Sequence, residues 1–279
     1  MSGLFASNLF RRVLTAVVVL PVVIGAIALF PQRGPWILAA ILCVLGITEA
    51  HTLLGRAAIP ASHISFFPGI ALFCELAGAP DAARVFPFSG LPIVASVPVA
   101  LIAIMRADRF GIPVLAAEAA GVLSGLLIGL GAGSFAALAR IAPIEEGTAR
   151  IALLMAVVIS SDVFAYFTGH ALGRHKLAPQ VSPGKTIEGA IGGLVGAALA
   201  SAMVATQLFA SQPVGLIVTI GVLVAVAGIV GDLLESLFKR YVGAKDSGTL
   251  FPGHGGALDR MDAFILAAPL LYVFFNNLS

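Results

Sequence analysis

Long apolar runs, separated by short polar stretches, follow one another along almost the whole chain. Nine of them predict helices, at residues 13–30, 35–54, 63–79, 88–105, 112–135, 149–171, 187–210, 214–233 and 263–277. A helix needs roughly 20 apolar residues to cross the ~30 Å hydrocarbon core of a bilayer. The third, fourth and last runs are short, and the fourth contains Pro92 and Pro98. The pattern predicts an all-α, polytopic integral membrane protein with about nine transmembrane helices.

Composition points to the same class of protein and excludes a soluble domain. The 279-residue chain is 59% hydrophobic and 11% charged, whereas soluble domains are roughly 45–50% apolar and about 25% charged. The apolar runs are unbroken, while the strands of a transmembrane barrel alternate apolar and polar residues. Cys43 and Cys74 both lie within apolar runs, so we expect neither a disulfide framework nor a thiolate metal site.

Basic residues are distributed unevenly between the two sides of the predicted helices. In a nine-span arrangement, 12 of the 16 lysines and arginines lie in connections on the side of the N-terminus. Connections rich in lysine and arginine stay in the cytoplasm. The count predicts a multi-pass protein of the cell membrane with its N-terminus and polar loops in the cytoplasm, and we expect no nucleic-acid partner.

Polar residues divide the chain into two regions. Residues 1–147 are apolar helices with scattered charges, and we interpret them as a lipid pocket or a dimer face, which leaves a homodimer open. Residues 148–279 contain three polar islands, and we interpret them as the catalytic region. In the first region Glu49, Glu75 and Glu118 stand isolated in apolar runs, and the sequence assigns them only packing or pairing roles.

The first candidate site follows the eighth apolar run. If its helix continues, polar side chains spaced three or four residues apart share one face: Asp232, Glu235, Ser236, Lys239 and Arg240. A helix end that extends its cations to the headgroups would explain Lys239 and Arg240. It does not explain Asp232, because an unpaired carboxylate directly after an apolar run is costly in a membrane. We therefore expect a functional role for Asp232.

A glycine-rich turn, "PGHGG" at 252–256, precedes the last apolar run. Glycines let backbone N–H groups approach a ligand closely. Asp259 and Asp262 follow one helical turn apart, where a capped helix start is the simple alternative. With Asp232 they form a set of carboxylates that suits Mg²⁺ and substrate phosphates. Nearby cations are candidate phosphate ligands: Lys239, Arg240, Lys245 and Arg260.

Two further polar islands lie between residues 160 and 189. "SPGKTIEG" is not a P-loop, because Pro179 stands where a glycine is required and no strand is expected before it. It offers Lys185 and Thr186 just before a helix, either as a phosphate site or as a simple helix cap. Asp162 lies in the middle of an apolar run, and a carboxylate inside a membrane is a functional candidate by default.

The spaced pattern at the C-terminal end resembles the signature of phosphatidate cytidylyltransferases, also called CDP-diacylglycerol synthases. It comprises Ser236, Lys239, Arg240, Lys245, Asp246, Pro252, Gly253, His254, Gly255, Gly256, Asp259, Arg260 and Asp262. The stretches "GDLLES", "SPGKTIEG" and the one around Asp162 also fit. The resemblance covers about residue 160 to the C-terminus, and over the first half only the hydropathy pattern matches.

This resemblance implies a reaction in which CTP and phosphatidate give CDP-diacylglycerol and pyrophosphate, with Mg²⁺ and, as an open alternative, a second, monovalent cation. The metal ligands implied are Asp232 and Asp259. The phosphate ligands implied are Lys185, Lys239, Arg240 and Arg260. Residues implied to orient substrates are Asp162, Glu188, Asp246, His254 and Asp262. Lys245 completes the catalytic set, and the further substrate-binding candidates are Ser182, Thr186, Glu235, Ser236, Gly255 and Gly256.

Two other classes of function compete with this interpretation. A secondary transporter would use Asp162 and Asp232 as ion sites, but it predicts two related halves with interrupted helices, and no such symmetry is visible. A related CTP-using membrane enzyme, such as a polyprenol kinase or a transferase for another lipid phosphate, would share the same metal chemistry. A CDP-alcohol phosphotransferase would carry a D-G-x-x-A-R run, which is absent.

Overall fold

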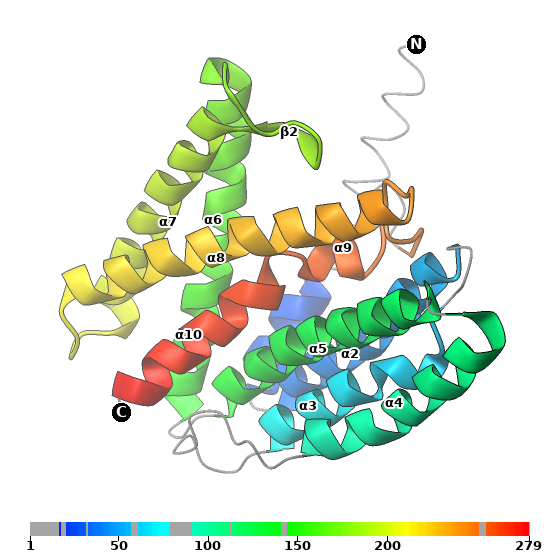
Figure 1. Ribbon diagram of the computed structural model, residues 1–279. Coiled ribbons are helices and arrows are strands. Elements are labelled where there is room, and N and C mark those ends of the chain that lie inside the picture. Colours follow the sequence, from blue (N-terminus) through cyan, green and yellow to red (C-terminus); the bar gives the residue numbers. More distant parts are fainter. Residues whose placement is uncertain are drawn as a thin grey trace.

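The structure is a computed structural model that describes residue 17 and residues 21–31, 33–56, 61–78, 91–111, 113–140, 144–250 and 255–278. These residues are almost entirely helical (Figure 1). The helices are α2 (Arg33–Leu54), η1 (His63–Phe66), α3 (Phe67–Gly78), α4 (Leu91–Phe110), α5 (Pro113–Ala139), α6 (Ile144–Leu172), α7 (Ile187–Leu208), α8 (Val214–Tyr241), α9 (Leu258–Met261) and α10 (Phe264–Leu278). The strands are β1 (Lys176–Ala178) and β2 (Ser182–Thr186).

Among the described residues, five helices are long and apolar enough to cross a membrane: α2, α5, α6, α7 and α8. The segments 63–78 and 94–107 are apolar but shorter, and α10 has 15 residues. The all-α, polytopic membrane class is thus confirmed, whereas the count of nine spans is not. The first predicted run, 13–30, lies partly outside the described residues.

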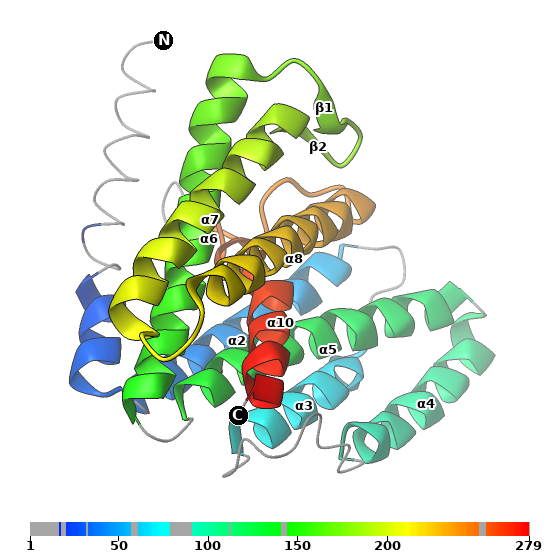
Figure 2. The same ribbon diagram turned by 90° about the vertical axis from the view of Figure 1, so that its left-hand side faces the viewer.

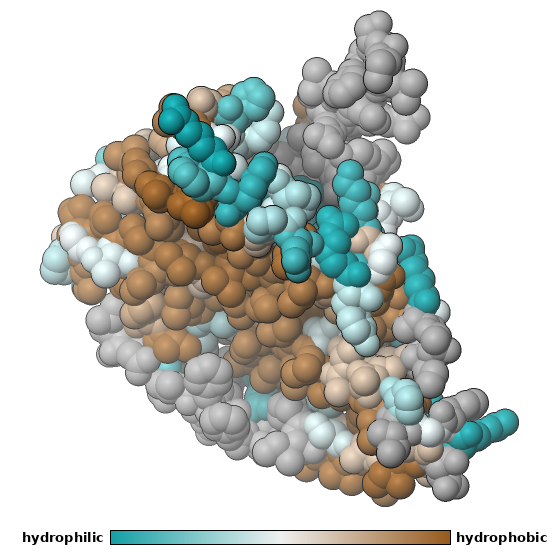
Figure 3. All heavy atoms as spheres, turned by 45° about the horizontal axis from the view of Figure 1, so that its top comes forward, coloured by the Kyte–Doolittle hydropathy of each residue, from teal (hydrophilic) through white to brown (hydrophobic). Residues whose placement is uncertain are grey.

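The outer surface has the apolar character that a bilayer requires. On α7, a row of large side chains spaced four residues apart is exposed: Ile191, Val195, Leu199 and Met203. Figure 3 shows a broad hydrophobic area over α7 and α8, bordered by hydrophilic residues toward the hairpin. Large contiguous apolar surfaces on a folded protein mark contact with lipid or a partner. Lipid fits this surface because the helices that form it, α7 and α8, are long enough to span a bilayer.

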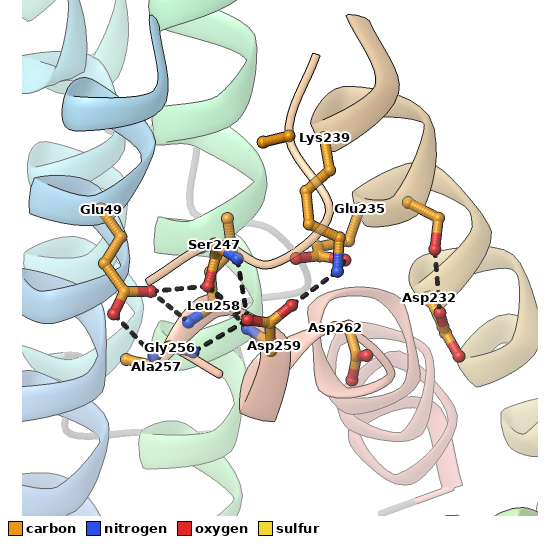
Figure 4. A network of polar contacts seen from close by, with 12 residues as sticks. Glu49, Asp232, Glu235, Lys239, Ser247, Gly256, Ala257, Leu258, Asp259 and Asp262 are labelled. Atoms are coloured by element: carbon orange, nitrogen blue, oxygen red, sulfur yellow. Dashed lines mark hydrogen bonds and ion pairs between the residues drawn. The ribbon is translucent and has the colours of Figure 1, made fainter. Parts of the chain in front are cut away.

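Close helix packing depends on small residues, as is common in membranes. Helix α3 crosses α5 where Gly69 meets Gly125 and Gly129, and a Cβ atom on Gly69 would clash with the carbonyl oxygen of Gly125. Helices α6 and α7 lie side by side over most of their length, and α10 packs against both α5 and α8 (Figure 2). The candidate site lies along the C-terminal half of α8, between α2 and α9 (Figure 4) and the hairpin (Figure 1).

The polar segment between α6 and α7 corrects one expectation. It forms an antiparallel hairpin in which Lys176 pairs with Thr186 and Ala178 with Ser182. The prediction that no strand precedes "SPGKTIEG" is therefore wrong, since β1 comes before it, and "SPGKT" itself is β2. Outside the apolar runs the chain still has to pair its backbone polar groups, and it does so here by folding back on itself.

Helix α8 confirms the conditional prediction for the eighth run. It extends from Val214 to Tyr241, so the helix continues through Asp232 and Arg240. The last turn of α8 contains two basic residues, Lys239 and Arg240. The helix dipole stabilises positive side chains at this end of a helix. Helix α8 therefore carries the polar residues from the apolar interior to the end of the bundle.

Candidate active site

A buried network of charges centres on Asp259, in the short helix α9 (Figure 4). Lys239 Nζ donates to Asp259 Oδ1 at 2.5 Å and also pairs with Glu235 Oε2 at 2.5 Å. Asp259 Oδ2 accepts hydrogen bonds from Ser247 N at 2.9 Å, Ser247 Oγ at 2.8 Å and Gly256 N at 2.8 Å. Lys239 and Glu235 are only 8% and 4% exposed, so this charge pair is shielded from water.

The environment of Asp259 favours its ionised form. Burial alone would raise the pKa of this carboxyl group. The hydrogen bonds from Lys239, Gly256 and Ser247 outweigh burial and hold the pKa below its ordinary value. Asp259 is therefore an anion that fixes the loop after α8 and the start of α9 to the end of α8.

Glu49, from the first half of the chain, completes this network. Its carboxylate accepts hydrogen bonds from Ser247 Oγ at 2.9 Å, Ala257 N at 2.8 Å and Leu258 N at 2.9 Å. It thus caps the backbone N–H groups at the start of α9 and shares Ser247 with Asp259. The sequence had assigned Glu49 only a packing or pairing role. Its partners lie 198 to 209 residues further along the chain, and the one available signal was its position as an acid in an apolar run.

The two described glycines of the glycine-rich turn allow this carboxylate arrangement. Gly255 has φ +83°, in the left-handed region that favours glycine. A Cβ atom on Gly255 would clash with Asp259 Oδ2, and one on Gly256 would clash with Glu49 and Ser247. A backbone approach of these glycines to a ligand stays a prediction, and in the structure their close approach is to side chains of the protein itself.

A polar cleft of about 490 Å³ lies between α6, α7, the hairpin and α8. Lys185 forms an ion pair with Asp232 in this cleft, and Asp162 lies on its wall. Small residues such as Gly169, Gly189 and Gly228 make room for it. The structure thus brings together three candidates from three separate polar islands of the sequence: Asp162, Lys185 and Asp232.

The residues at the hairpin have mainly structural contacts. Thr186 Oγ1 accepts a hydrogen bond from Gly189 N at 3.1 Å and caps α7, as the simple alternative proposed. Glu188 accepts hydrogen bonds from Arg174 N at 3.1 Å and His175 N at 3.2 Å, and contacts His175 Nδ1 at 2.6 Å. Ser182 begins β2, two residues before Gly184 on the cleft wall. These contacts fix the hairpin relative to α7.

Residues near the end of α8 connect the hairpin to the loop that follows. Arg240 donates through Nε to the carbonyl oxygen of Val181 at 3.3 Å and through Nη1 to that of Ala244 at 3.1 Å. Ser236 Oγ donates to Asp232 Oδ1 at 3.4 Å. Lys245 and Asp246 are exposed on this loop. His254 lies outside the described residues, as do Pro252 and Gly253.

Asp262 lies close to the cleft, just before α10. Burial and the negative charge of Asp232 raise the pKa of the Asp262 carboxyl group to about 7, although a hydrogen bond from Ala263 N at 2.7 Å opposes this. Arg260, one residue after Asp259, is exposed. Asp232 and Asp262 therefore form an acidic pair beside the Asp259 network.

The profile of the cytidylyltransferase family matches residues 10–278. The chain belongs to this family. A protein named phosphatidate cytidylyltransferase from Brucella abortus biovar 1 (strain 9-941) is 50% identical over 128 residues, which cover 46% of this chain and 47% of the relative. A protein of the same name from Staphylococcus saprophyticus is 41% identical over 129 residues, covering 46% of this chain and 50% of the relative. The chain thus matches about half the length of these curated relatives.

An Escherichia coli (strain K12) protein with no assigned activity, "Uncharacterized protein YnbB", is also similar. It is 40% identical over 131 residues, which cover 47% of this chain and 44% of the relative. The relatives named for a phosphatidate cytidylyltransferase match to a similar extent. Membership of the family is therefore shown by the profile over most of the chain, and the substrate is a separate question.

The predicted metal ligands Asp232 and Asp259 are not equivalent in this cytidylyltransferase. The described residues contain no group of three or more His, Cys, Asp or Glu side chains arranged to hold a metal ion. Both oxygens of Asp259 accept hydrogen bonds, whereas Asp232 pairs with Lys185 and lies near Asp262. The carboxylate chemistry suits a hard cation, and the acidic pair Asp232 and Asp262 is the part of the site where a positive charge would relieve repulsion.

Proposed function

We propose that this cytidylyltransferase transfers the cytidylyl group of CTP to phosphatidate, giving CDP-diacylglycerol and pyrophosphate. The observation that carries this proposal is the buried network in which Lys239 bridges Glu235 and Asp259, next to the cleft that contains Lys185 and Asp232. Such charges at the end of membrane-spanning helices can meet a water-soluble nucleotide and a lipid phosphate in one place. The names of the curated relatives support the same two substrates.

The proposed chemistry is a displacement at phosphorus. A phosphate oxygen of phosphatidate forms a bond to the α-phosphorus of CTP, and the bond from this phosphorus to the bridging oxygen of the β-phosphate breaks. Pyrophosphate leaves with the electron pair of the broken bond. Reactions of this kind depend mainly on positioning and on electrostatic stabilisation, so the protein has to supply fixed charges.

Side chains at three positions would supply these charges. Lys185 lies in the cleft, where it can exchange its partner Asp232 for a phosphate oxygen. Arg260 and Lys239 would hold further phosphate oxygens. Glu235 and Asp259 fix the position of Lys239, because its ammonium group is bonded to both.

The acidic side chains also fit a divalent cation. We include Mg²⁺ in the proposal, with Asp232 and Asp259 as the predicted ligands and Asp262 beside Asp232. When bound, the ion would supply a fixed positive charge for the phosphate oxygens. The raised pKa of Asp262 next to Asp232 supports this, because a cation stabilises two neighbouring carboxylates. A second, monovalent cation stays a prediction.

The proposal includes the cell membrane as the location, with the hairpin and the loop residues 242–250 and 255–257 at its cytoplasmic surface. CTP is a cytoplasmic nucleotide, and phosphatidate enters from the bilayer. The excess of basic residues on this side supports the orientation.

A substrate panel tests the proposal. Detergent-purified protein is incubated with CTP labelled in its α-phosphate or, in parallel, in its γ-phosphate and, in separate reactions, phosphatidate, polyprenol and polyprenyl phosphate, each with Mg²⁺ and with a chelator. We expect labelled CDP-diacylglycerol from phosphatidate when Mg²⁺ is present and none when the chelator is present. Labelling of a polyprenol in place of phosphatidate would assign the chain to a related CTP-using enzyme, and no turnover of any lipid would contradict the proposal.

A further inference from the structure

A second cavity, also of about 490 Å³, lies on the other side of α8 and is almost purely apolar. It is a groove between α5 and α8, and we call it the α5–α8 groove. Both helices pack against α10, which holds them apart and leaves the groove between them. Its walls include Ala116, Ala119, Leu123, Leu234, Leu237 and Phe238.

One side of the groove is open to the exterior. Leu123 from α5 is 61% exposed, and Leu237 and Tyr241 from α8 are 51% and 66% exposed. Because α5 and α8 are both long enough to span a membrane, this open side would face hydrocarbon in the proposed membrane location. A groove lined by apolar side chains suits a lipid chain better than water, since water makes few favourable contacts with an apolar wall.

The inner end of the groove reaches the candidate active site. Glu235 lines the groove, and its carboxylate pairs with Lys239 at 2.5 Å. Leu258, which also lines the groove, directly precedes Asp259 in α9. An acyl chain in the groove would therefore lead to a headgroup beside Lys239 and Asp259.

Helix α8 separates this groove from the polar cleft. Gly228, Ile229 and Asp232 line the cleft, whereas Gly231, Leu234 and Glu235 line the groove. The two sets occupy adjoining strips along the same helix, so that Asp232 and Glu235, three residues apart, are neighbours on either side of the border between cleft and groove. The two cavities are thus suited to different parts of the reaction: charged groups on one face and hydrocarbon on the other.

We infer that the α5–α8 groove binds one acyl chain of the lipid phosphate substrate, and that small residues on α5 set the space available to it. This inference rests on the proposed function and identifies where its lipid substrate docks. It also gives the first half of the chain a share in substrate binding, because α5 provides one wall. Ala116 and Ala119 are exposed in the groove, so a larger side chain there projects into the space of the acyl chain and not into the protein core.

The test compares long and short acyl chains in one assay. For the wild type and for Ala119→Phe, the KM for dioleoyl phosphatidate is divided by the KM for dihexanoyl phosphatidate. We expect this ratio to rise about tenfold in the variant, equivalent to about 1.4 kcal/mol and thus to the loss of about two buried CH₂ groups. Leu115→Phe is the matched control, because Leu115 is exposed on the same helix but does not line the groove.

An unchanged ratio in Ala119→Phe, or an equal rise in Leu115→Phe, would overturn the inference. If Ala119→Phe does not fold, Ala116→Phe takes its place one turn earlier. Failure of the proposed function has a different signature, because the wild type would then make no product from either phosphatidate. In that case a lipid phosphate with a photoreactive diazirine in its acyl chain still tests the groove: crosslinks to 116–127 and 231–241 support it, and crosslinks confined to α7 overturn it.

Discussion

The polar cleft and the α5–α8 groove are similar in volume but opposite in character. The cleft contains Asp162, Lys185 and Asp232, whereas Glu235 is the one charged residue among the described residues that line the groove. Helix α8 forms a wall of both, and Asp232 and Glu235 are only three residues apart. A single helix can therefore present a charged surface to one substrate and an apolar surface to another. The Asp259 network, which includes Lys239, lies at the end of α8 where the two surfaces meet.

The largest effect is expected from removing the lysine at this meeting point. Lys239→Met leaves Asp259 and Glu235 without their common partner. Loss of one partner from a buried ion pair costs about 3–5 kcal/mol, so the variant should unfold at a clearly lower temperature and lose cytidylyl transfer. Thermal unfolding in detergent and the radiolabel assay measure both. A stable and active Lys239→Met protein would show that the two surfaces do not depend on this contact.

A second prediction concerns Glu49, which acts through α9 as a positioning residue. Glu49→Gln weakens the hydrogen bonds to Ala257 and Leu258, and bonds to a charged group contribute about 1.5–3 kcal/mol each. We expect kcat to fall about tenfold, which corresponds to about 1.4 kcal/mol, while the KM for CTP changes little.

Glu118→Gln is the matched control for Glu49. Glu118 is also an acid on an apolar helix, but it pairs with Arg106 and Ser62, away from the site. Its loss should lower the unfolding temperature without the specific fall in kcat. Equal kinetic effects of both variants would argue against a positioning role for Glu49.

The pH dependence of stability should report the acidic pair at the cleft. The raised pKa of Asp262, about 7 in place of 3.8, means that the folded protein binds this proton more tightly than the unfolded chain does. The Asp262 contribution to stability is therefore present at low pH and falls as pH rises from about 4 to about 7. In the presence of a chelator, Asp262→Asn should flatten this part of the stability profile. An unchanged profile would contradict a close Asp232–Asp262 pair.

The smallest effect concerns the wall of the cleft formed by α7. Thr186→Ala removes the cap of this helix, which costs about 1 kcal/mol, and the KM for CTP should change little. Thr206→Ala, near the other end of α7, removes a hydroxyl group that bonds only within the helix and serves as the control. A large rise in the KM for CTP with no loss of stability would instead identify Thr186 as a substrate ligand.

The sequence predicted those features that depend on local pattern. The membrane class follows from the apolar runs, and the continuation of α8 through Arg240, which the spacing of Asp232 to Arg240 allowed as a condition, is present in the structure. That Asp162, Lys185 and Asp232 share one cleft agrees with their selection as site candidates. Their functional roles stay predictions.

Features that depend on contacts between distant segments could not be predicted in this way. Glu49 reaches Ser247 across 198 residues, and no local spacing encodes such a pair. The hairpin at 176–186 was missed because its strands have three and five residues and no hydrophobic alternation. The groove depends on how α5 and α8 diverge from α10, which only the packing of the helices determines.

The central claim is that the Asp259 network carries cytidylyl transfer to phosphatidate. Its most direct test is the rate of CDP-diacylglycerol formation by Asp259→Asn. The control is Glu145→Gln, which changes an exposed carboxylate at the N-terminal end of α6, the end that is far from the hairpin. We predict a loss of at least about a hundredfold for Asp259→Asn, comparable to the removal of one preorganised electrostatic group, and a nearly normal rate for Glu145→Gln. A folded Asp259→Asn protein with a rate close to wild type would contradict the account.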